Sequence, residues 1–222
     1  HGQIRRQRQM CIRDRPFSDP MADGPAIQAS SKRALEAGGS LKKTLDMVRI
    51  FREKNNFTPI ILMGYYNPIY NFGVQKFLTE VIEAGADGLI VVDLPPEEDI
   101  ELCIPAKECN LPFVRLTAPT TSNERLTTVL QNATGFIYYV SITGITGTKK
   151  ASIQEIEKSL NVIKTLTKLP IAVGFGISTQ KQIKEISNVA NAAVVGSHIV
   201  KIIENEFSNN KTNLFDVEKV LK

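Results

Sequence analysis

The sequence predicts one α/β domain built as a parallel (β/α)8 barrel, and three observations lead to this fold class. From residue 40 onward, short apolar runs alternate with amphipathic helical stretches. The runs are almost continuously hydrophobic, as is typical of strands buried on both faces of a parallel sheet. The glycine clusters come late, at 144–147, 174–176 and 196. Late phosphate-binding turns favour a barrel over an open doubly wound sheet, whose Gly-rich turn follows its first strand.

Six apolar runs are predicted as strands because they are short and bounded by turn residues. They span residues 59–63, 88–92, 112–116, 135–140, 170–173 and 192–195. Helices are predicted between them at 41–54, 74–84, 97–108, 122–132, 152–167, 179–189, 197–206 and 213–221, with a shorter one at 26–37. In 152–167, isoleucines and leucines recur at intervals of three and four, which places them on one face of a helix.

The segment before Pro16 differs from the rest of the chain. Residues 5–15 have no helical or strand period, and reverse translation of them spells a common transposon-type sequencing adaptor. We therefore expect residues 1–15 to be non-native and 16–222 to form the single domain. The barrel would then lack its first strand, its first helix and most of its second strand. The sequence does not determine whether residues 9–14 occupy the vacant strand position. The alternative to a non-native segment is an Arg-rich transit peptide or a nucleic-acid arm.

The net charge of the chain gives no indication of a polyanionic partner. Residues 5–15 hold five arginines and one aspartate, which accounts for the whole net charge of +4. The remainder is neutral, so we expect neither nucleic acid nor a membrane surface as a partner. His1 and His198 are too few for a zinc site. Three cysteines without ligand spacing predict a reduced, cytoplasmic protein.

Two glycine turns are candidates for binding a phosphate. Gly176 lies in a Gly-Phe-Gly-Ile-Ser turn, and Gly196-Ser197 follows the next strand; each precedes a helix. Glycines allow backbone amides to approach an anion, and a helix N-terminus presents unpaired N–H groups. Each turn alone could instead be a tight turn with a Ser cap. As a pair after the last two strands they favour phosphate binding.

Carboxylates in Pro-stiffened loops are candidates for acid–base chemistry. Asp19 and Asp23 lie four residues apart in Pro-Phe-Ser-Asp-Pro-Met-Ala-Asp-Gly-Pro, and Asp93 follows a strand. A carboxylate held at the mouth of a barrel can accept a proton or bind a substrate N–H. The alternative for each of them is turn capping.

Aromatic residues and a hydroxyl-rich loop lie near other strand ends. Tyr65, Tyr66, Asn67 and Tyr70 follow the 59–63 strand and could line an aromatic pocket or a protein interface. Tyr138 lies inside a strand, where core packing is the alternative. The loop 141–148 is rich in Gly and hydroxyl groups, which is typical of a lid or of a flexible connection.

Together these motifs resemble the alpha chain of tryptophan synthase. The resemblance runs from Pro16 to about Lys222 and depends on residues 16–25, 65–68, 92–95, 144–147, 174–178 and 196–197. It implies a barrel that cleaves indole-3-glycerol phosphate to indole and glyceraldehyde 3-phosphate by a retro-aldol reaction, without a cofactor. It also implies a pyridoxal-phosphate-dependent beta chain as partner, in an alpha2-beta2 assembly, and a surface for that partner at Asp19 and 65–71.

The resemblance assigns roles to individual positions. Asp23 matches the catalytic aspartate that contacts the indole N–H. The substrate-binding positions are Tyr65, Tyr138, the lid residue Thr146, and Phe175, which packs on the indole ring. The phosphate-binding positions are Gly147, Gly176, Gly196 and Ser197. No metal is implied.

One position departs from the family pattern. The second catalytic carboxylate of the family is a glutamate four residues before the Pro-Phe-Ser-Asp motif, where this chain has Ile12. An isoleucine cannot transfer a proton. We therefore expect the natural protein to be a lyase and this chain to be inactive and prone to aggregation. The alternative is a non-catalytic barrel that binds a sugar phosphate and acts as a regulatory partner.

Overall fold

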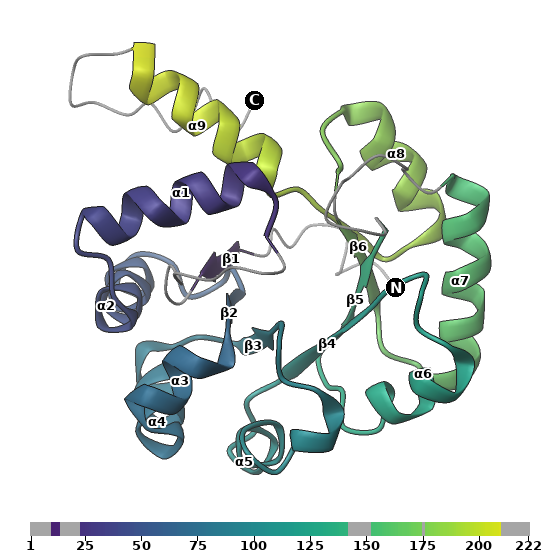
Figure 1. The fold of residues 1–222 in the computed structure, drawn as a ribbon, viewed down its shortest axis with the longest axis horizontal. Helices are drawn as coiled ribbons and strands as arrows, with labels where there is room; N and C mark the ends of the chain where they lie inside the picture. The colour runs from purple at the N-terminus through teal and green to yellow at the C-terminus, as the bar shows by residue number, and fades with distance from the viewer. Residues whose placement is uncertain (1–9, 14–22, 142–151, 175, 210–222) are drawn as a thin grey trace.

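The computed structural model describes residues 10–13, 23–141, 152–174 and 176–209. Its centre is a sheet of seven parallel strands in which each strand pairs with the next one along the chain (Figure 1). The strands are β1 (Met10–Arg13), β2 (Ile60–Gly64), β3 (Gly88–Val91), β4 (Phe113–Thr117), β5 (Ile137–Val140), β6 (Ile171–Gly174) and β7 (Ala192–Val194). This order is that of a (β/α) barrel.

Alternation along each strand divides the core into two layers. One face of the sheet carries side chains that form one cluster, including Met63, Ile90, Val114, Tyr138 and Ala172. The other face packs under the helices in two larger clusters. Strands β2, β3 and β6 are buried at every position, as strands between two covered faces must be.

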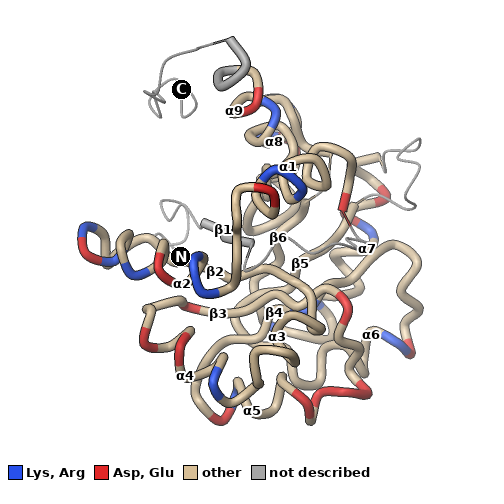
Figure 2. The backbone as a smooth tube through the Cα atoms, turned by 60° about the vertical axis from the view of Figure 1, so that its left-hand side comes forward, with Lys and Arg blue, Asp and Glu red and all other residues tan. Residues whose placement is uncertain are grey.

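Helices cover the outer face of the sheet between successive strands (Figure 1). They are α1 (Pro25–Glu36), α2 (Leu41–Arg52), α3 (Tyr66–Phe72), α4 (Val74–Ala84), α5 (Cys103–Glu108), α6 (Asn123–Leu130), α7 (Ile153–Leu166), α8 (Gln180–Val189) and α9 (Ser197–Asn209), with a 3-10 turn η2 at Pro96–Glu98. Capping boxes begin α7 at Ser152 and α8 at Thr179. Basic and acidic residues both occur along the outer helices α1 and α2 (Figure 2).

The six predicted strands are confirmed to within two residues at each end. The single helix predicted at 97–108 is wrong, because the α-helix begins only at Cys103. Pro105 explains the late start, since a proline ring in a helix interior clashes with the preceding turn. Helix α3 was not predicted, and the helix predicted at 213–221 lies outside the described residues.

Strand β1 lies beside β2 at the edge of the sheet, in the strand position whose occupant the sequence did not determine. It comes from the adaptor-like segment and pairs with β2 in parallel, with Ile12 opposite Leu62. Among the described residues no ladder joins β7 to β1, so the barrel is incomplete as expected. Helices α1 and α9 pack across this side of the molecule (Figure 1), and Arg33 Nη1 donates to Glu204 Oε1 at 2.9 Å.

Candidate active site

The described candidate residues gather at the carboxyl ends of the strands. Tyr65 directly follows β2, and Tyr138 lies in β5. Gly176 comes two residues after β6 and Gly196 two residues after β7. Because the sheet is parallel, these ends meet at one edge, which is where (β/α) barrels place their active sites.

Asp23 lies at the entrance to α1 and is only 6% exposed. The following Gly24 is the N-cap, with Pro25 in the first turn, so the chain turns sharply into the helix here. Gln28 Nε2 donates to the backbone carbonyl of Asp23 at 2.8 Å and fixes this turn. A buried carboxylate held by a rigid backbone is suited to binding one specific N–H group.

Tyr138 is buried on the inner face of the sheet and packs closely on Gly174 of the neighbouring strand. A Cβ atom built on Gly174 would lie 2.3 Å from the Tyr138 hydroxyl oxygen. Glycine at 174 therefore makes room for the tyrosine ring. Next to it, Ser141 Oγ donates to the Gly174 carbonyl at 2.8 Å, which joins the ends of β5 and β6.

The two predicted phosphate turns lie side by side. Gly174 pairs with Val194, so Gly176 and Gly196 lie at equivalent distances beyond adjacent strands. Gly176 has φ +76°, a conformation that favours glycine. The geometry therefore brings Gly176, Gly196 and Ser197 to one corner of the sheet edge, and all three are exposed.

The two turns differ in how their amides are used. At the start of α8, Gln182 Oε1 accepts hydrogen bonds from the amides of Ser178 and Thr179, at 2.9 and 3.2 Å. Those amides already donate to a side chain within the turn, which is the behaviour of a capped tight turn and not of an open anion site. The first turn of α9 is therefore the better anion site of the two, because a glycine precedes a full-length helix there.

A residue in the turn after β3 organises the tyrosine cluster that follows β2. Asp93 Oδ1 accepts a hydrogen bond from the amide of Tyr66 at 2.7 Å and so caps the start of α3. This contact agrees with the interpretation of Asp93 as a capping residue. Tyr65 is buried, whereas Tyr70 is 62% exposed. Burial and a hydrogen bond to Glu101 raise the pKa of Tyr66 to about 12.

A buried charged network between β4 and the connection after β3 was missed in the sequence. Arg115 and Asp99, whose side chains are 4% and 7% exposed, form an ion pair. Arg115 Nη1 also donates to the Leu94 carbonyl at 2.7 Å, and Asn132 Nδ2 donates to Asp99 at 2.8 Å. Burial lowers the pKa of Arg115 to about 10. The available signal was an arginine in the middle of an apolar strand.

Several predicted positions lie outside the described residues. These are Asp19, Thr146, Gly147 and Phe175, together with the side chain of Ile12. Within the described ranges no group of three or more His, Cys, Asp or Glu residues could hold a metal ion. In the same ranges no helix is long and apolar enough to cross a bilayer.

The sequential parallel strands, their outer helices and a site at the carboxyl edge define a (β/α)-barrel protein. The family model described as "Tryptophan synthase alpha chain" matches residues 15–222. The chain therefore belongs to the tryptophan synthase alpha chain family, and its fold is that family's barrel.

Solved structures of known relatives agree with this assignment. Tryptophan synthase subunit alpha from Legionella pneumophila is 37% identical with a TM-score of 0.81, over 92% of this chain and 74% of that one. A Pyrococcus furiosus chain, from work on mutual activation of the tryptophan synthase α2β2 complex, is 42% identical with a TM-score of 0.77, over 86% and 77%. An Aquifex aeolicus VF5 chain is 39% identical with a TM-score of 0.78, over 85% and 71%.

Proposed function

We propose that this protein is an alpha subunit that cleaves indole-3-glycerol phosphate to indole and glyceraldehyde 3-phosphate. The observation that carries the proposal is Asp23, a buried carboxylate at the entrance to α1, in the loop whose motif resembles that of the family. In the reaction the bond between indole C3 and the glycerol carbon breaks, and its electron pair stays on the indole. C3 gains a proton, and the glycerol hydroxyl loses one as the aldehyde forms.

The side chains divide this work between binding and proton transfer. Asp23 accepts a hydrogen bond from the indole N–H and stabilises the positive charge that develops on the ring. Tyr65, Tyr138, Thr146 and Phe175 enclose the indole. Gly147, Gly176, Gly196 and Ser197 hold the phosphate. The reaction needs no cofactor, and pyridoxal phosphate belongs to the beta partner.

The missing element is the proton donor at position 12. Isoleucine has no ionisable group, so this chain should bind substrate without turning it over. A non-catalytic barrel that binds a sugar phosphate and regulates its partner is the second candidate, and Ile12 is the observation that favours it.

The test compares this chain with Ile12→Glu and with the matched control Ile12→Gln, measuring indole release from indole-3-glycerol phosphate. We expect turnover only with glutamate, and its loss in Ile12→Glu/Asp23→Asn. Turnover by the unaltered chain would show that position 12 does not supply the proton. If calorimetry detects no binding of the substrate to any of these chains, the proposed function is wrong.

We further propose that the protein works in the cytoplasm with a beta chain as its partner. The solved Pyrococcus furiosus relative, studied in an α2β2 complex, and the exposed Tyr70 on α3 support this partner. Tyr70→Asp should weaken capture of a purified beta chain, because aromatic anchors in an interface lose their contacts when replaced by a charge. Unchanged capture would place the interface elsewhere.

A further inference from the structure

Two arginine side chains tie the sheet to its connections, one at each end of the strands. Arg52 of α2 donates from Nε to the Gly85 carbonyl at 2.7 Å and from Nη1 to the Thr58 carbonyl at 2.8 Å. Both acceptors lie just before a strand begins, so this network is at the amino edge of the sheet. Arg115 of β4 instead binds the connection that follows β3. In a (β/α) barrel the amino edge serves stability, and the carboxyl edge carries the function.

Arg115 holds the connection after β3 at two points. Its Nη1 donates to the Leu94 carbonyl at 2.7 Å, and its Nη2 forms the ion pair with Asp99. Asn132 Nδ2 donates to the second oxygen of the Asp99 carboxylate at 2.8 Å. A Pro-Pro pair at 95–96 lies between the two points, and its fixed φ angles leave the chain little freedom there. The connection is therefore held as one rigid unit.

The same connection holds the start of helix α3 at two points. Asp93 Oδ1 accepts a hydrogen bond from the Tyr66 amide at 2.7 Å, and Glu101 Oε2 accepts one from the Tyr66 hydroxyl at 2.9 Å. Asp93 directly precedes the segment that Arg115 binds, and Glu101 closely follows it. Tyr65, the N-cap residue of α3, is only 2% exposed. The position of Tyr65 therefore depends on Arg115 through this connection.

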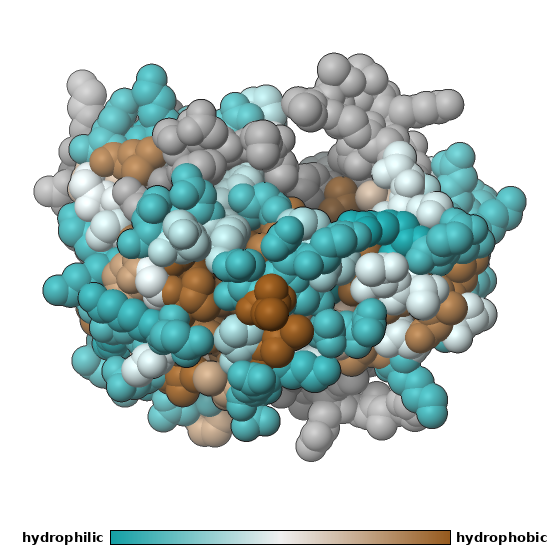
Figure 3. Space-filling view, turned by 60° about the horizontal axis from the view of Figure 1, so that its bottom comes forward, coloured by the Kyte–Doolittle hydropathy of each residue, from teal (hydrophilic) through white to brown (hydrophobic). Residues whose placement is uncertain are grey.

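The buried pair has no role at the surface. On the side of α4 and α5 the surface is mainly hydrophilic, with small apolar groups (Figure 3). Arg115 and Asp99 add nothing to it, because their side chains are buried. A buried ion pair often contributes no more stability than apolar residues of the same volume. What it does supply is direction, since the planar guanidinium binds its acceptors in a fixed geometry.

We propose that Arg115 is a positioning residue for the candidate active site. It holds the connection after β3, the connection holds Tyr66, and Tyr65 is thereby fixed at the carboxyl end of β2. The inference rests on the proposed function, in which Tyr65 helps to enclose the indole of the substrate. Loss of this tether weakens substrate binding in a protein that is still folded.

The test separates positioning from stability with a double variant. Arg115→Met/Asp99→Leu removes the tether and fills the space of the buried pair with apolar side chains, so it should stay folded. Its affinity for indole-3-glycerol phosphate, measured by calorimetry, should fall about tenfold, because a small displacement of a binding group is costly. The Tyr66 amide should exchange with solvent about tenfold faster by NMR, because Asp93 no longer stays in place to accept its hydrogen bond.

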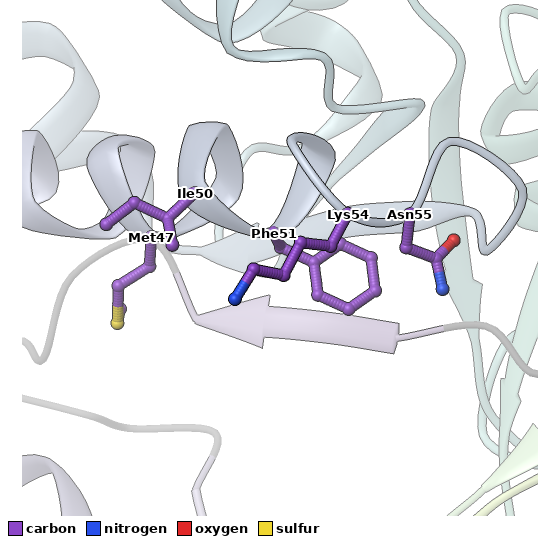
Figure 4. Close-up of a pocket in the computed structure, with 5 residues that line it drawn as sticks. All are labelled: Met47, Ile50, Phe51, Lys54 and Asn55. Atoms are coloured by element: carbon purple, nitrogen blue, oxygen red, sulfur yellow. The ribbon is translucent and has the colours of Figure 1, made fainter.

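Two controls lie away from this connection. Arg52→Met breaks the comparable network at the amino edge, so it should lower the Tm and leave substrate affinity and Tyr66 exchange unchanged. Met47 lies on α2 among the residues that line a surface hollow (Figure 4). Met47→Ala should change neither substrate affinity nor Tyr66 exchange.

Unchanged substrate affinity in the folded double variant overturns the proposal. An equal loss of affinity in Arg52→Met also overturns it, because general stability and not the tether would then set the site. If the unaltered chain binds no substrate, the proposed function is wrong, whereas faster Tyr66 exchange in the double variant alone still shows that Arg115 positions α3. Should the double variant not fold, Arg115→Lys replaces it and should show the same two changes, since a lysine lacks the second arm for the Leu94 carbonyl.

Discussion

At the scale of single residues, Gly174 and Tyr138 act as a pair. The tyrosine ring fills the space that a side chain at 174 would need. Gly174→Ala should therefore destabilise the protein by about 1–3 kcal/mol, because the added methyl group forces Tyr138 or the strand to move. Urea unfolding followed by circular dichroism measures this change in the free energy of unfolding.

The matched control is Gly24→Ala. A Cβ on Gly24 would meet nothing within 4 Å, so only the weaker N-cap preference is lost, about 0.5–1 kcal/mol. Equal costs for the two substitutions would mean that Tyr138 does not occupy the space beside Gly174. Because Tyr138 is a proposed substrate residue, Gly174→Ala should also weaken substrate binding.

The two described cysteines should differ in reactivity. Cys103 is buried and Cys109 exposed. Burial raises the pKa of the Cys103 thiol to about 11, so at pH 8 almost none of it is thiolate, which is the reactive form. Iodoacetamide at pH 8 should modify Cys109 and spare Cys103 in the folded protein, and modify both in urea. Peptide mass mapping distinguishes the two sites, and rapid labelling of native Cys103 would contradict the burial of this helix face.

At the scale of elements, the Arg115 network joins β4 to the connection that follows β3. Arg115→Met leaves the Asp99 carboxylate buried without its cation, which should cost about 3–5 kcal/mol. The double variant Arg115→Met/Asp99→Leu should recover much of this loss. Chemical unfolding of these proteins and of the single variant Asp99→Leu gives the coupling energy between the two side chains. Arg49→Met, which breaks a partly exposed pair with Glu80, is the control and should cost about 1 kcal/mol or less.

The neighbouring pair Glu97–Arg125 joins η2 to α6 and predicts a pH effect. The Arg125 guanidinium lowers the pKa of Glu97 from 4.5 to about 2. A pKa that is lower in the folded state adds stability that is present above pH 4.5 and lost as the pH falls toward 2. Carboxyl NMR titration should give a pKa of about 2 for Glu97 and a higher pKa for the same group in Arg125→Gln. An unchanged pKa in the variant would show that the pair does not form in solution.

Local patterns in the sequence predicted most elements, because strand runs and helical stripes are properties of neighbouring residues. Helix α3 was missed for a physical reason. It is short and contains Pro68, and its amide cap comes from Asp93, which lies in the turn after β3. The Arg115 network could not be foreseen either, since Leu94 and Asp99 lie in the connection after β3 and Asn132 follows α6, all distant from Arg115 in the sequence. Of the site, the sequence could name Asp23 and Gly176 by motif but not the packing of Tyr138 on Gly174.

At the scale of the whole molecule, stability should fall from the middle of the sheet toward both edges. Strands β2 to β6 lie between two paired neighbours and are almost fully buried, whereas all three residues of β7 are only partly buried. Strand β1 pairs on one side alone among the described strands. Exposed edges of this kind also favour association, which is why we expect the chain to aggregate.

Hydrogen exchange followed by mass spectrometry tests this gradient. Amides of β4 and β5, at the centre of the sheet, should exchange slowest, because they open only with the whole domain. Those of β1 and β7 should exchange by local opening, much faster. Uniform protection across all seven strands would instead mean that the sheet closes on itself and that its edges are not free.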